Sequence, residues 1–262
     1  MRSPFPNRHC AIGRPFPGAA AVALLGALLL LPRGASSENP PQPVLVELFT
    51  SEGCSSCPPA DRILMELDRR QPVPEASIVV LSEHVDYWDH EGWRDPFSSY
   101  HWTERQNDYV RQFGLDSPYT PQMVIDGNRQ VTGGDGRAIV SAIEQSAKAS
   151  HIDIAISSLE RSGDSVRLEF TAGAAKGATV YAVLADDADR SSVVRGENAG
   201  HTLEHVAVAR TLVRVAKLDK SPLDQKIAIP IPPGDANRRL RIIVFAQNGQ
   251  NGHIVGVAAR QL

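Results

Sequence analysis

The sequence is poor in cysteine. Only Cys10, Cys54 and Cys57 occur in 262 residues, and no cysteine follows residue 57. Structural zinc sites hold their metal with four Cys or His ligands, commonly arranged as two pairs along the chain. A single Cys pair without a second pair at matching spacing therefore argues against a structural zinc domain.

The chain also lacks a hydrophobic run long enough to span a membrane comfortably. Its longest run covers residues 19–31, whereas a spanning helix needs about 20 apolar residues. Three arginines precede this run and the small residues 34–37 follow it. This pattern predicts a secretory signal peptide over residues 1–37 and a periplasmic or secreted mature protein. An uncleaved anchor is the alternative, because Pro32-Arg33 interrupts the approach to the cleavage site.

An excess of positive charge is missing as well. The chain has 27 Lys and Arg against 30 Asp and Glu, and removal of residues 1–37 would leave 23 basic residues, a net charge of −7. Such an acidic protein is a poor partner for nucleic acid or for an anionic membrane, so we expect neither association. Cleavage also removes Cys10, and export places Cys54 and Cys57 where a disulfide forms and persists.

Residues 44–61 are the stretch around which the chain is organised. Residues 44–49 are mostly apolar and predict a buried strand, and a short polar turn then leads to the Cys54-x-x-Cys57 pair. The helix that follows is indicated by apolar residues on one face. These residues are Ala60, Ile63, Leu64 and Leu67. Strand, C-x-x-C and helix together are far more specific for redox chemistry than C-x-x-C alone.

A thiol at a helix N-terminus meets unpaired N–H groups and the positive end of the helix dipole. Both favour the thiolate, which is the reactive form. The pattern therefore predicts Cys54 as the exposed nucleophile and Cys57 as the resolving thiol. A structural disulfide is an alternative, although so short a loop constrains the unfolded chain little. Half of a zinc site is the other alternative.

The next segments predict alternating strands and helices up to about residue 150. Residues 77–81 read as a buried strand, followed by a polar and aromatic loop over residues 83–97 at its carboxyl end, where ligands bind in open α/β sheets. Asp95-Pro96 predicts the start of a helix that ends at Phe113. A strand at 123–125, a hairpin, and a helix capped by Asp135 complete the order β, α, β, α, β, β, α.

From His151 the pattern changes to alternation of apolar and polar residues. Ile152, Ile154 and Ile156 alternate, and further strands are expected at 166–170, 179–184, 205–217, 226–231, 240–247 and 253–259. Period-two alternation with turn signals predicts an antiparallel β-sandwich over residues 151–262. The segment Gly196-Glu197-Asn198 is expected to be a structural loop that docks onto the first half of the chain.

The order of elements, with C-x-x-C at the first helix and Thr120-Pro121 entering the third strand, resembles the thioredoxin superfamily. The resemblance implies an α/β thioredoxin-like domain over residues 38–150, followed by the antiparallel β-sandwich domain. It also implies that Pro121 is cis and packs against the active-site disulfide, and that Thr120 lines the substrate groove. Glu47 would be the buried carboxylate that serves the inner thiol.

A closer resemblance is to a secreted bacterial group, domain-of-unknown-function family 1223. Four segments carry it: V-E-L-F-T-S-E-G-C-S-S-C-P-P-A-D (46–61), H-V-D-Y-W-D-H-E-G-W-R-D-P-F (84–97), Y-T-P-Q-M-V-I-D-G (119–127) and R-G-E-N-A-G-H-T-L-E-H (195–205). The similarity covers essentially the whole mature chain. It implies the fold and the export, and it supplies no established substrate.

The leading functional hypothesis is an exported thiol–disulfide oxidoreductase. It acts on protein or small-thiol disulfides with an unidentified redox partner, and no cofactor or metal is expected. The predicted catalytic residues are Cys54, Cys57 and Glu47, and the predicted substrate-binding residues are Thr120, Pro121, His84 and Trp88. The alternative is a non-catalytic module that binds a metal or a partner, for which His84, Asp86, Asp89 and His90 are candidate ligands.

Overall fold

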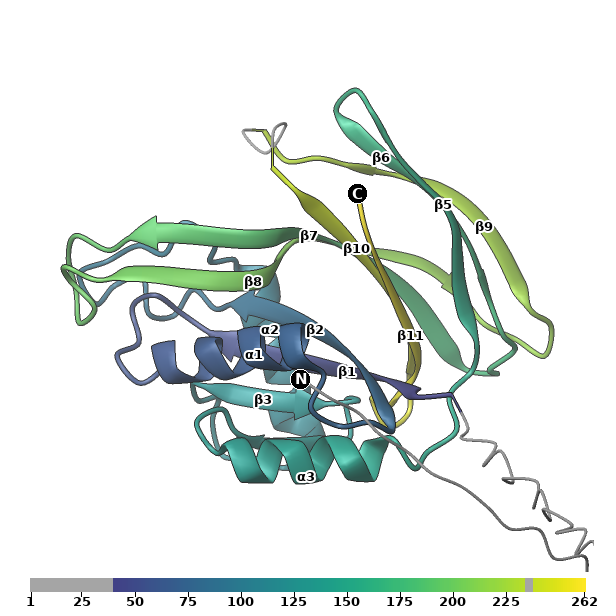
Figure 1. Ribbon diagram of the computed structural model, residues 1–262, viewed down its shortest axis with the longest axis horizontal. Helices are drawn as coiled ribbons and strands as arrows, with labels where there is room; N and C mark the ends of the chain where they lie inside the picture. Colours follow the sequence, from purple (N-terminus) through teal and green to yellow (C-terminus); the bar gives the residue numbers. More distant parts are fainter. Residues whose placement is uncertain (1–39, 234–237) are drawn as a thin grey trace, which may run out of the picture. The chain divides into compact units, whose positions relative to one another are not determined.

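One mixed β-sheet runs through most of the molecule (Figure 1). The computed structural model describes residues 40–233 and 238–262, so the predicted signal peptide lies outside the described residues. The described elements are β1 (Gln42–Thr50), α1 (Pro58–Arg70), β2 (Ala76–His84), α2 (Tyr100–Phe113), β3 (Gln122–Ile125), β4 (Arg129–Thr132), α3 (Gly136–Ser146), β5 (Ile154–Ser162), β6 (Ser165–Ala172), β7 (Ala178–Ser192), β8 (Thr202–Lys217), β9 (Leu223–Pro230), β10 (Leu240–Asn248) and β11 (Ile254–Gln261). None of these helices is both long and apolar enough to cross a membrane.

The strand order of the large sheet is β11-β10-β7-β8-β2-β1-β3-β4. β1 and β2 are parallel and fully paired, whereas β1 pairs with β3 in antiparallel fashion. β2 and β8 meet in a short parallel contact at Ser82 and Val208. β7, β8, β10 and β11 pair only in antiparallel fashion with one another. The sheet thus joins a largely N-terminal half to a C-terminal half through β2 and β8.

The helices cover both faces of the N-terminal half of this sheet. Alternation along β1 sends Val44, Val46 and Leu48 into one core, which they share with apolar residues of α1 and α3. Leu45 and Phe49 point to the opposite face, where they pack with residues of α2 such as Trp102 and Tyr109. The Cys pair follows β1 directly, at the edge where β1 and β2 both end.

A second sheet, β5-β6-β9, covers one face of the C-terminal half. Its strand β6 alternates strictly, and Val166, Leu168 and Phe170 are fully buried. They form one core with apolar residues of β7 and β10, including Val180 and Ile242. The predicted antiparallel strands of residues 151–262 are therefore present, and two layers of them do pack face to face.

The predicted fold class is nevertheless wrong. The protein is mostly β, and the sheet that contains the Cys-bearing βαβ unit continues through β8, β7, β10 and β11. An α/β thioredoxin-like domain followed by a separate β-sandwich does not describe it. Residues 39–262 form one compact unit by their contacts. This arrangement could not be predicted from local sequence patterns, because the contact between β2 and β8 joins residues more than a hundred positions apart.

Candidate functional site

The candidate site is built around a disulfide between Cys54 and Cys57. Cys57 is the N-cap of α1, with Pro58 at the first helical position, and its N–H donates to the Cys54 carbonyl at 3.1 Å. Proline fits there because the first helical N–H groups have no partner inside the helix. Both cysteines are buried, with 1% and 0% of their surface exposed. Cys54 was expected to be the exposed sulfur, and in this oxidised state it is not.

A long hairpin from the C-terminal half contacts residues 52–57, which contain the two cysteines and are called the Cys segment. Its strands are the end of β7 and the start of β8, and residues 193–201 join them. The Asn198 side chain donates to the carbonyls of Glu52 and Cys54 at 2.8 and 3.0 Å. The Glu197 carboxylate accepts the N–H of Ser55 at 3.0 Å. The expectation that Gly196-Glu197-Asn198 docks onto the first half of the chain is confirmed.

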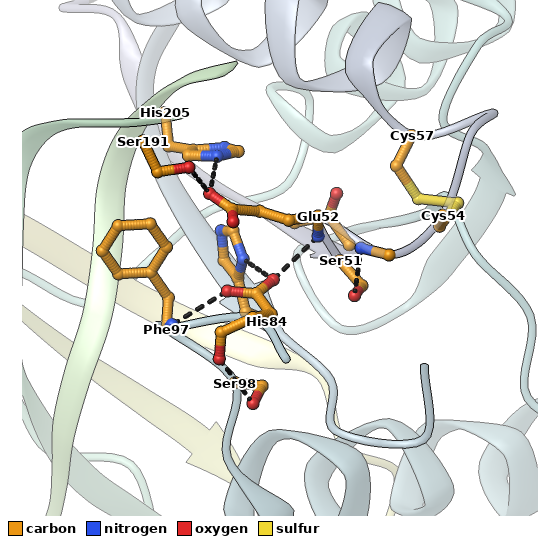
Figure 2. A network of polar contacts seen from close by, with 12 residues as sticks. Ser51, Glu52, Cys54, Cys57, His84, Phe97, Ser98, Ser191 and His205 are labelled. Atoms are coloured by element: carbon orange, nitrogen blue, oxygen red, sulfur yellow. Dashed lines mark hydrogen bonds and ion pairs between the residues drawn. A yellow bond between two sulfur atoms is a disulfide. The ribbon is translucent and has the colours of Figure 1, made fainter. Parts of the chain in front are cut away.

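Donors from three other segments hold the Glu52 carboxylate, and two of these donors, Ser191 and His205, are labelled in Figure 2. Its carboxylate accepts hydrogen bonds from Trp93 Nε1 at 2.8 Å, from Ser191 Oγ, and from His205 Nε2 at 3.2 Å. Figure 2 shows the Glu52 side chain pointing away from the disulfide, toward His205 and Ser191. Glu52 therefore links the Cys segment to β7 and β8 and has little remaining capacity to accept a proton.

His205 lies between Glu52 and Asp61. Its Nδ1 is 3.6 Å from Asp61 Oδ1, which is an ion-pair distance, and the other Asp61 oxygen accepts from Thr50 Oγ1 at 3.3 Å. Burial alone lowers the pKa of His205, but the bonds and charges of Asp61 and Glu52 raise that pKa to about 10. The imidazole is therefore a cation at neutral pH, enclosed with two carboxylates.

Asp61 is the polar residue of this group that stands nearest to Cys57 in the chain. It lies one helical turn after Cys57, and its N–H donates to the Cys57 carbonyl at 3.1 Å. Side chains four residues apart on a helix are neighbours. Asp61 is 5% exposed, and among the described residues its Oδ1 accepts no short hydrogen bond and faces His205 Nδ1 at 3.6 Å. A buried carboxylate oxygen in this state is a candidate proton acceptor.

The end of β2 and the loop after it hold the backbone of the Cys segment through His84 and Asp95. His84 is fully buried, and its Nδ1 lies 2.7 Å from Asp95 Oδ2, which also accepts the N–H of Glu52 at 2.8 Å. Burial raises the pKa of Asp95, but the charge and bonds of His84 and two backbone N–H groups bring it below its usual value. The His84 ring also meets the His205 ring edge to face, with centroids 4.7 Å apart. His84 is thus placed to order the site from within rather than on its surface.

Trp88, Thr120 and Pro121 lie on the other side of the Cys segment. Trp88 Nε1 donates to Thr120 Oγ1 at 2.8 Å, and a Cβ on Gly53 would stand 3.0 Å from Trp88 Cβ. The Thr120–Pro121 peptide bond is cis, as the resemblance implied. Pro121 lies near the first turn of α1, since a Cβ on Gly133 would meet both Pro121 and Ala60. The structure therefore gathers these three predicted residues beside the disulfide segment.

Glu47 is placed differently. It lies on β1 with its side chain toward α2, where its carboxylate accepts from Arg105 Nε and Tyr109 Oη, both at 2.6 Å. Glu83 from β2 lies in the same buried group, 3.2 Å from Arg105 Nε. The cysteines follow the end of β1 and lead into α1, which covers the opposite face of the sheet. The contacts of Glu47 thus assign it to the packing of α2.

Three of the four candidate metal ligands at the end of β2 and in the following loop have separate partners. His84 pairs with Asp95, Asp86 accepts from Thr103 Oγ1 at 2.6 Å, and Asp89 accepts from Ser98 Oγ at 2.8 Å. His90 is exposed. Within residues 40–233 and 238–262, no group of three or more His, Cys, Asp or Glu side chains is arranged to hold a metal ion.

Three residues of the site, Glu52, Asp61 and His205, were not singled out from the sequence. Asp61 left a signal, because it stands four residues after Cys57 at the start of an amphipathic helix. The sequence around His205 gives almost no indication of its role. His205 is separated from Asp61 by 144 positions, and it lies on a strand whose neighbours cannot be predicted locally. Only the fold brings the imidazole to the Cys segment.

Comparison with known proteins places this arrangement in a family. A family model described as "Protein of unknown function (DUF1223)" matches residues 45–247. A crystal structure of protein AGR_C_4864 from Agrobacterium tumefaciens is similar with a TM-score of 0.62 and 29% identity, covering 84% of this chain and 93% of that one. A β-glucosidase from Kluyveromyces marxianus aligns with a TM-score of only 0.22 and 12% identity, over 43% of this chain and 14% of that one. No curated protein matches the chain.

Proposed function

The chain belongs to the DUF1223 family of proteins of unknown function, and we propose that it is an exported thiol–disulfide oxidoreductase. The observation that carries the proposal is the Cys54–Cys57 disulfide at the start of α1, with a buried carboxylate one turn further on. Export rests on the pattern of residues 1–37, which predicts passage into an oxidising compartment. The substrates are protein or small-thiol disulfides.

The reaction proceeds by two exchange steps. The Cys54 thiolate attacks one sulfur of a substrate disulfide, forming a mixed disulfide while the other substrate sulfur leaves as a thiolate with the bonding electron pair. Cys57 then attacks Cys54 Sγ, which breaks the mixed disulfide and forms the Cys54–Cys57 bond. The substrate disulfide gains two electrons and the protein dithiol loses two. An unidentified thiol redox partner restores the dithiol.

Asp61 is the group we assign to the proton of Cys57. Cys57 is completely buried, so its thiol proton needs an acceptor inside the protein before the sulfur attacks. Glu52 already accepts from Trp93, Ser191 and His205, whereas Asp61 Oδ1 accepts no short hydrogen bond among the described residues and has the longer ion-pair contact with His205 Nδ1. The role first assigned to Glu47 therefore passes to Asp61.

Trp88 and Thr120 are the residues we propose for substrate contact, and the buried Pro121 shapes the backbone beside them. Trp88 and Thr120 are partly exposed and bonded to each other next to the Cys segment. His84 is fully buried and reaches Glu52 only through Asp95, so we assign it a positioning role instead of direct contact.

A trapping experiment tests the proposal. The Cys57→Ser variant lacks the resolving thiol, so mixed disulfides at Cys54 should accumulate in the periplasm, with Cys54→Ser/Cys57→Ser as the control. Reduced wild-type protein should also reduce insulin disulfides. A separate variant tests the role of Asp61: Asp61→Asn should slow re-formation of the Cys54–Cys57 bond by about 100-fold. Glu66→Gln, which removes an exposed carboxylate from the same helix, should have no effect. If no mixed disulfide is trapped and insulin is not reduced, the proposed thiol–disulfide oxidoreductase activity is rejected.

The burial of both sulfurs supports one second candidate, a partner-binding module with a passive disulfide. The reduction potential of the pair separates the two functions. Structural disulfides of secreted proteins have potentials below about −300 mV, whereas exchanging pairs have higher ones. A value in the lower range, together with no trapped mixed disulfide, would favour the passive module.

A further inference from the structure

The loop that joins β7 and β8, residues 193–201, is bonded to the segment that contains Cys54, and we call it the cover loop. Asn198 is 6% exposed, and its side-chain amide nitrogen donates two hydrogen bonds, to the carbonyls of Glu52 and Cys54. The Glu197 carboxylate accepts the N–H of Ser55, and hydrogen bonds from the Ser55 side chain and backbone lower the pKa of this exposed carboxyl. Ser55 and Ser56, between the cysteines, are exposed although both cysteines are buried.

The cover loop is also fixed from the side. Gly196 has a φ of +76°, and a Cβ at this position would stand 3.0 Å from Trp93 Cβ and 3.3 Å from the Glu91 carbonyl. The strands below the loop are attached to the Cys segment separately, through Ser191 and His205 on Glu52. The loop can therefore lift while its supporting strands remain in place, since different contacts hold each.

We propose that the cover loop is a gate over the Cys54–Cys57 disulfide, with Asn198 as its latch. In the closed state the sulfurs are shielded from thiols in solution, and the disulfide reacts when the bonds of Asn198 and Glu197 break and the loop opens. Local openings of this kind need only a fraction of the free energy of global unfolding. The gate concerns the access of any thiol, so it does not depend on the proposed physiological reaction.

Asn198 is the latch because of the geometry of its amide. One side chain joins two carbonyls that are two residues apart, Glu52 and Cys54, in a buried setting. Each such bond contributes modestly to the closed state, but loss of both releases the tip of the loop from the Cys segment. The Glu197 bond is exposed to water and is expected to hold less strongly.

The test is the rate at which dithiothreitol reduces the oxidised full mature chain at neutral pH. The reagent loses two electrons and forms its own cyclic disulfide while the Cys54–Cys57 bond breaks to two thiols, which are counted by maleimide labelling and mass spectrometry. Asn198→Ala should react about tenfold faster or more than wild type. Glu204→Ala, which removes an exposed side chain of the same hairpin, should react at the wild-type rate.

A glycine pair keeps the test decisive if Asn198→Ala unfolds. Gly196→Ala and Gly200→Ala both place an alanine at positive φ, but only the first creates a clash with the loop at Trp93, since nothing lies within 4 Å of a Cβ at Gly200. Gly196→Ala should accelerate reduction well beyond Gly200→Ala. Equal rates for the two glycine variants, or a wild-type rate in folded Asn198→Ala, overturn the gate. Because dithiothreitol is not the substrate, this result is separate from the trapping experiment.

Discussion

At the scale of single residues, His205 is an imidazolium held between two carboxylates. The groups that face it are Glu52 after β1, Asp61 on α1 and the ring of His84 on β2. Its pKa in the folded protein is about 10, above the usual value near 6.5. A pKa raised by folding means that His205 stabilises the fold fully below about pH 6.5, and that this stabilisation is lost as the pH rises through 10.

We therefore expect the wild-type free energy of unfolding to fall between pH 7 and pH 10 relative to His205→Gln. The difference should shrink by on the order of 2–4 kcal/mol, measured by denaturant unfolding at several pH values. Comparison with the variant removes the contribution of other groups that titrate in this range. His201→Gln is the matched control, because His201 is exposed on the cover loop. A constant difference across the pH range would show that His205 is not charged in the folded protein.

The sequence predicts the two cysteines and not the buried carboxylates and imidazole near them, for a physical reason. The Cys pair is predicted by a local pattern of strand, turn and helix, and Trp88 by its place in the loop after a strand. Thr120 and Pro121 come from the resemblance to the thioredoxin superfamily. Glu47 illustrates the limit. Period two shows that Glu47 and Leu48 face opposite sides of the sheet, but not which side α1 covers. The assignment of Glu47 to the cysteines needed that missing fact.

At the scale of elements, Arg105 attaches α2 to the sheet. Its guanidinium contacts Glu47 at 2.5 Å and Glu83 at 3.2 Å, and it stacks over the rings of Tyr109 and Phe245. Burial and the charge of Glu47 raise the pKa of Glu83, while Arg105 lowers it. One cation thus compensates two buried acids from β1 and β2.

Arg105→Leu should consequently destabilise the protein by roughly 3–5 kcal/mol, because it leaves buried acids without their cation. Arg111→Leu removes an exposed arginine from the same helix and should change stability by about 0.5 kcal/mol or less. Both values come from urea unfolding of residues 38–262. Similar losses in the two variants would show that Arg105 contributes only helix-surface interactions.

Element boundaries were predictable where local rules acted alone. Asp135 caps α3 through the N–H of Ala138, and α2 ends before Gly114, whose φ is +64°. The start of α2 was misplaced, since Ser99 is its N-cap and the Asp95 carboxylate is bonded to His84 and Glu52 instead. The end of β7 was not predicted because residues 186–192 are mostly polar, and pairing with β8 keeps this part of the strand in place.

At the scale of the whole molecule, the two halves share one of the cores on the α2 face of the sheet. Leu45, Leu81 and Trp102 from the first half pack with Val183, Ile243 and Phe245 from the second. Arg241 on β10 forms a bidentate ion pair with Asp68 on α1, with distances of 2.7 and 3.0 Å. The change in sequence pattern near residue 150 therefore marks a change of secondary structure, while the packing continues across it.

The fragment of residues 40–150 should accordingly fail to fold on its own. Without residues 151–262, β2 loses its neighbour β8, the apolar side chains around Leu81 and Trp102 lose their partners, and Asp68 loses Arg241. The exposed apolar surface removes a large part of the hydrophobic stabilisation, which exceeds the opposing entropy by only a small margin in any domain. Circular dichroism should show no cooperative thermal transition for the fragment, whereas residues 40–262 should unfold in one transition. A reversible, cooperative melt of the fragment would show instead that its β-α-β unit is an independent domain to which the C-terminal strands are only attached.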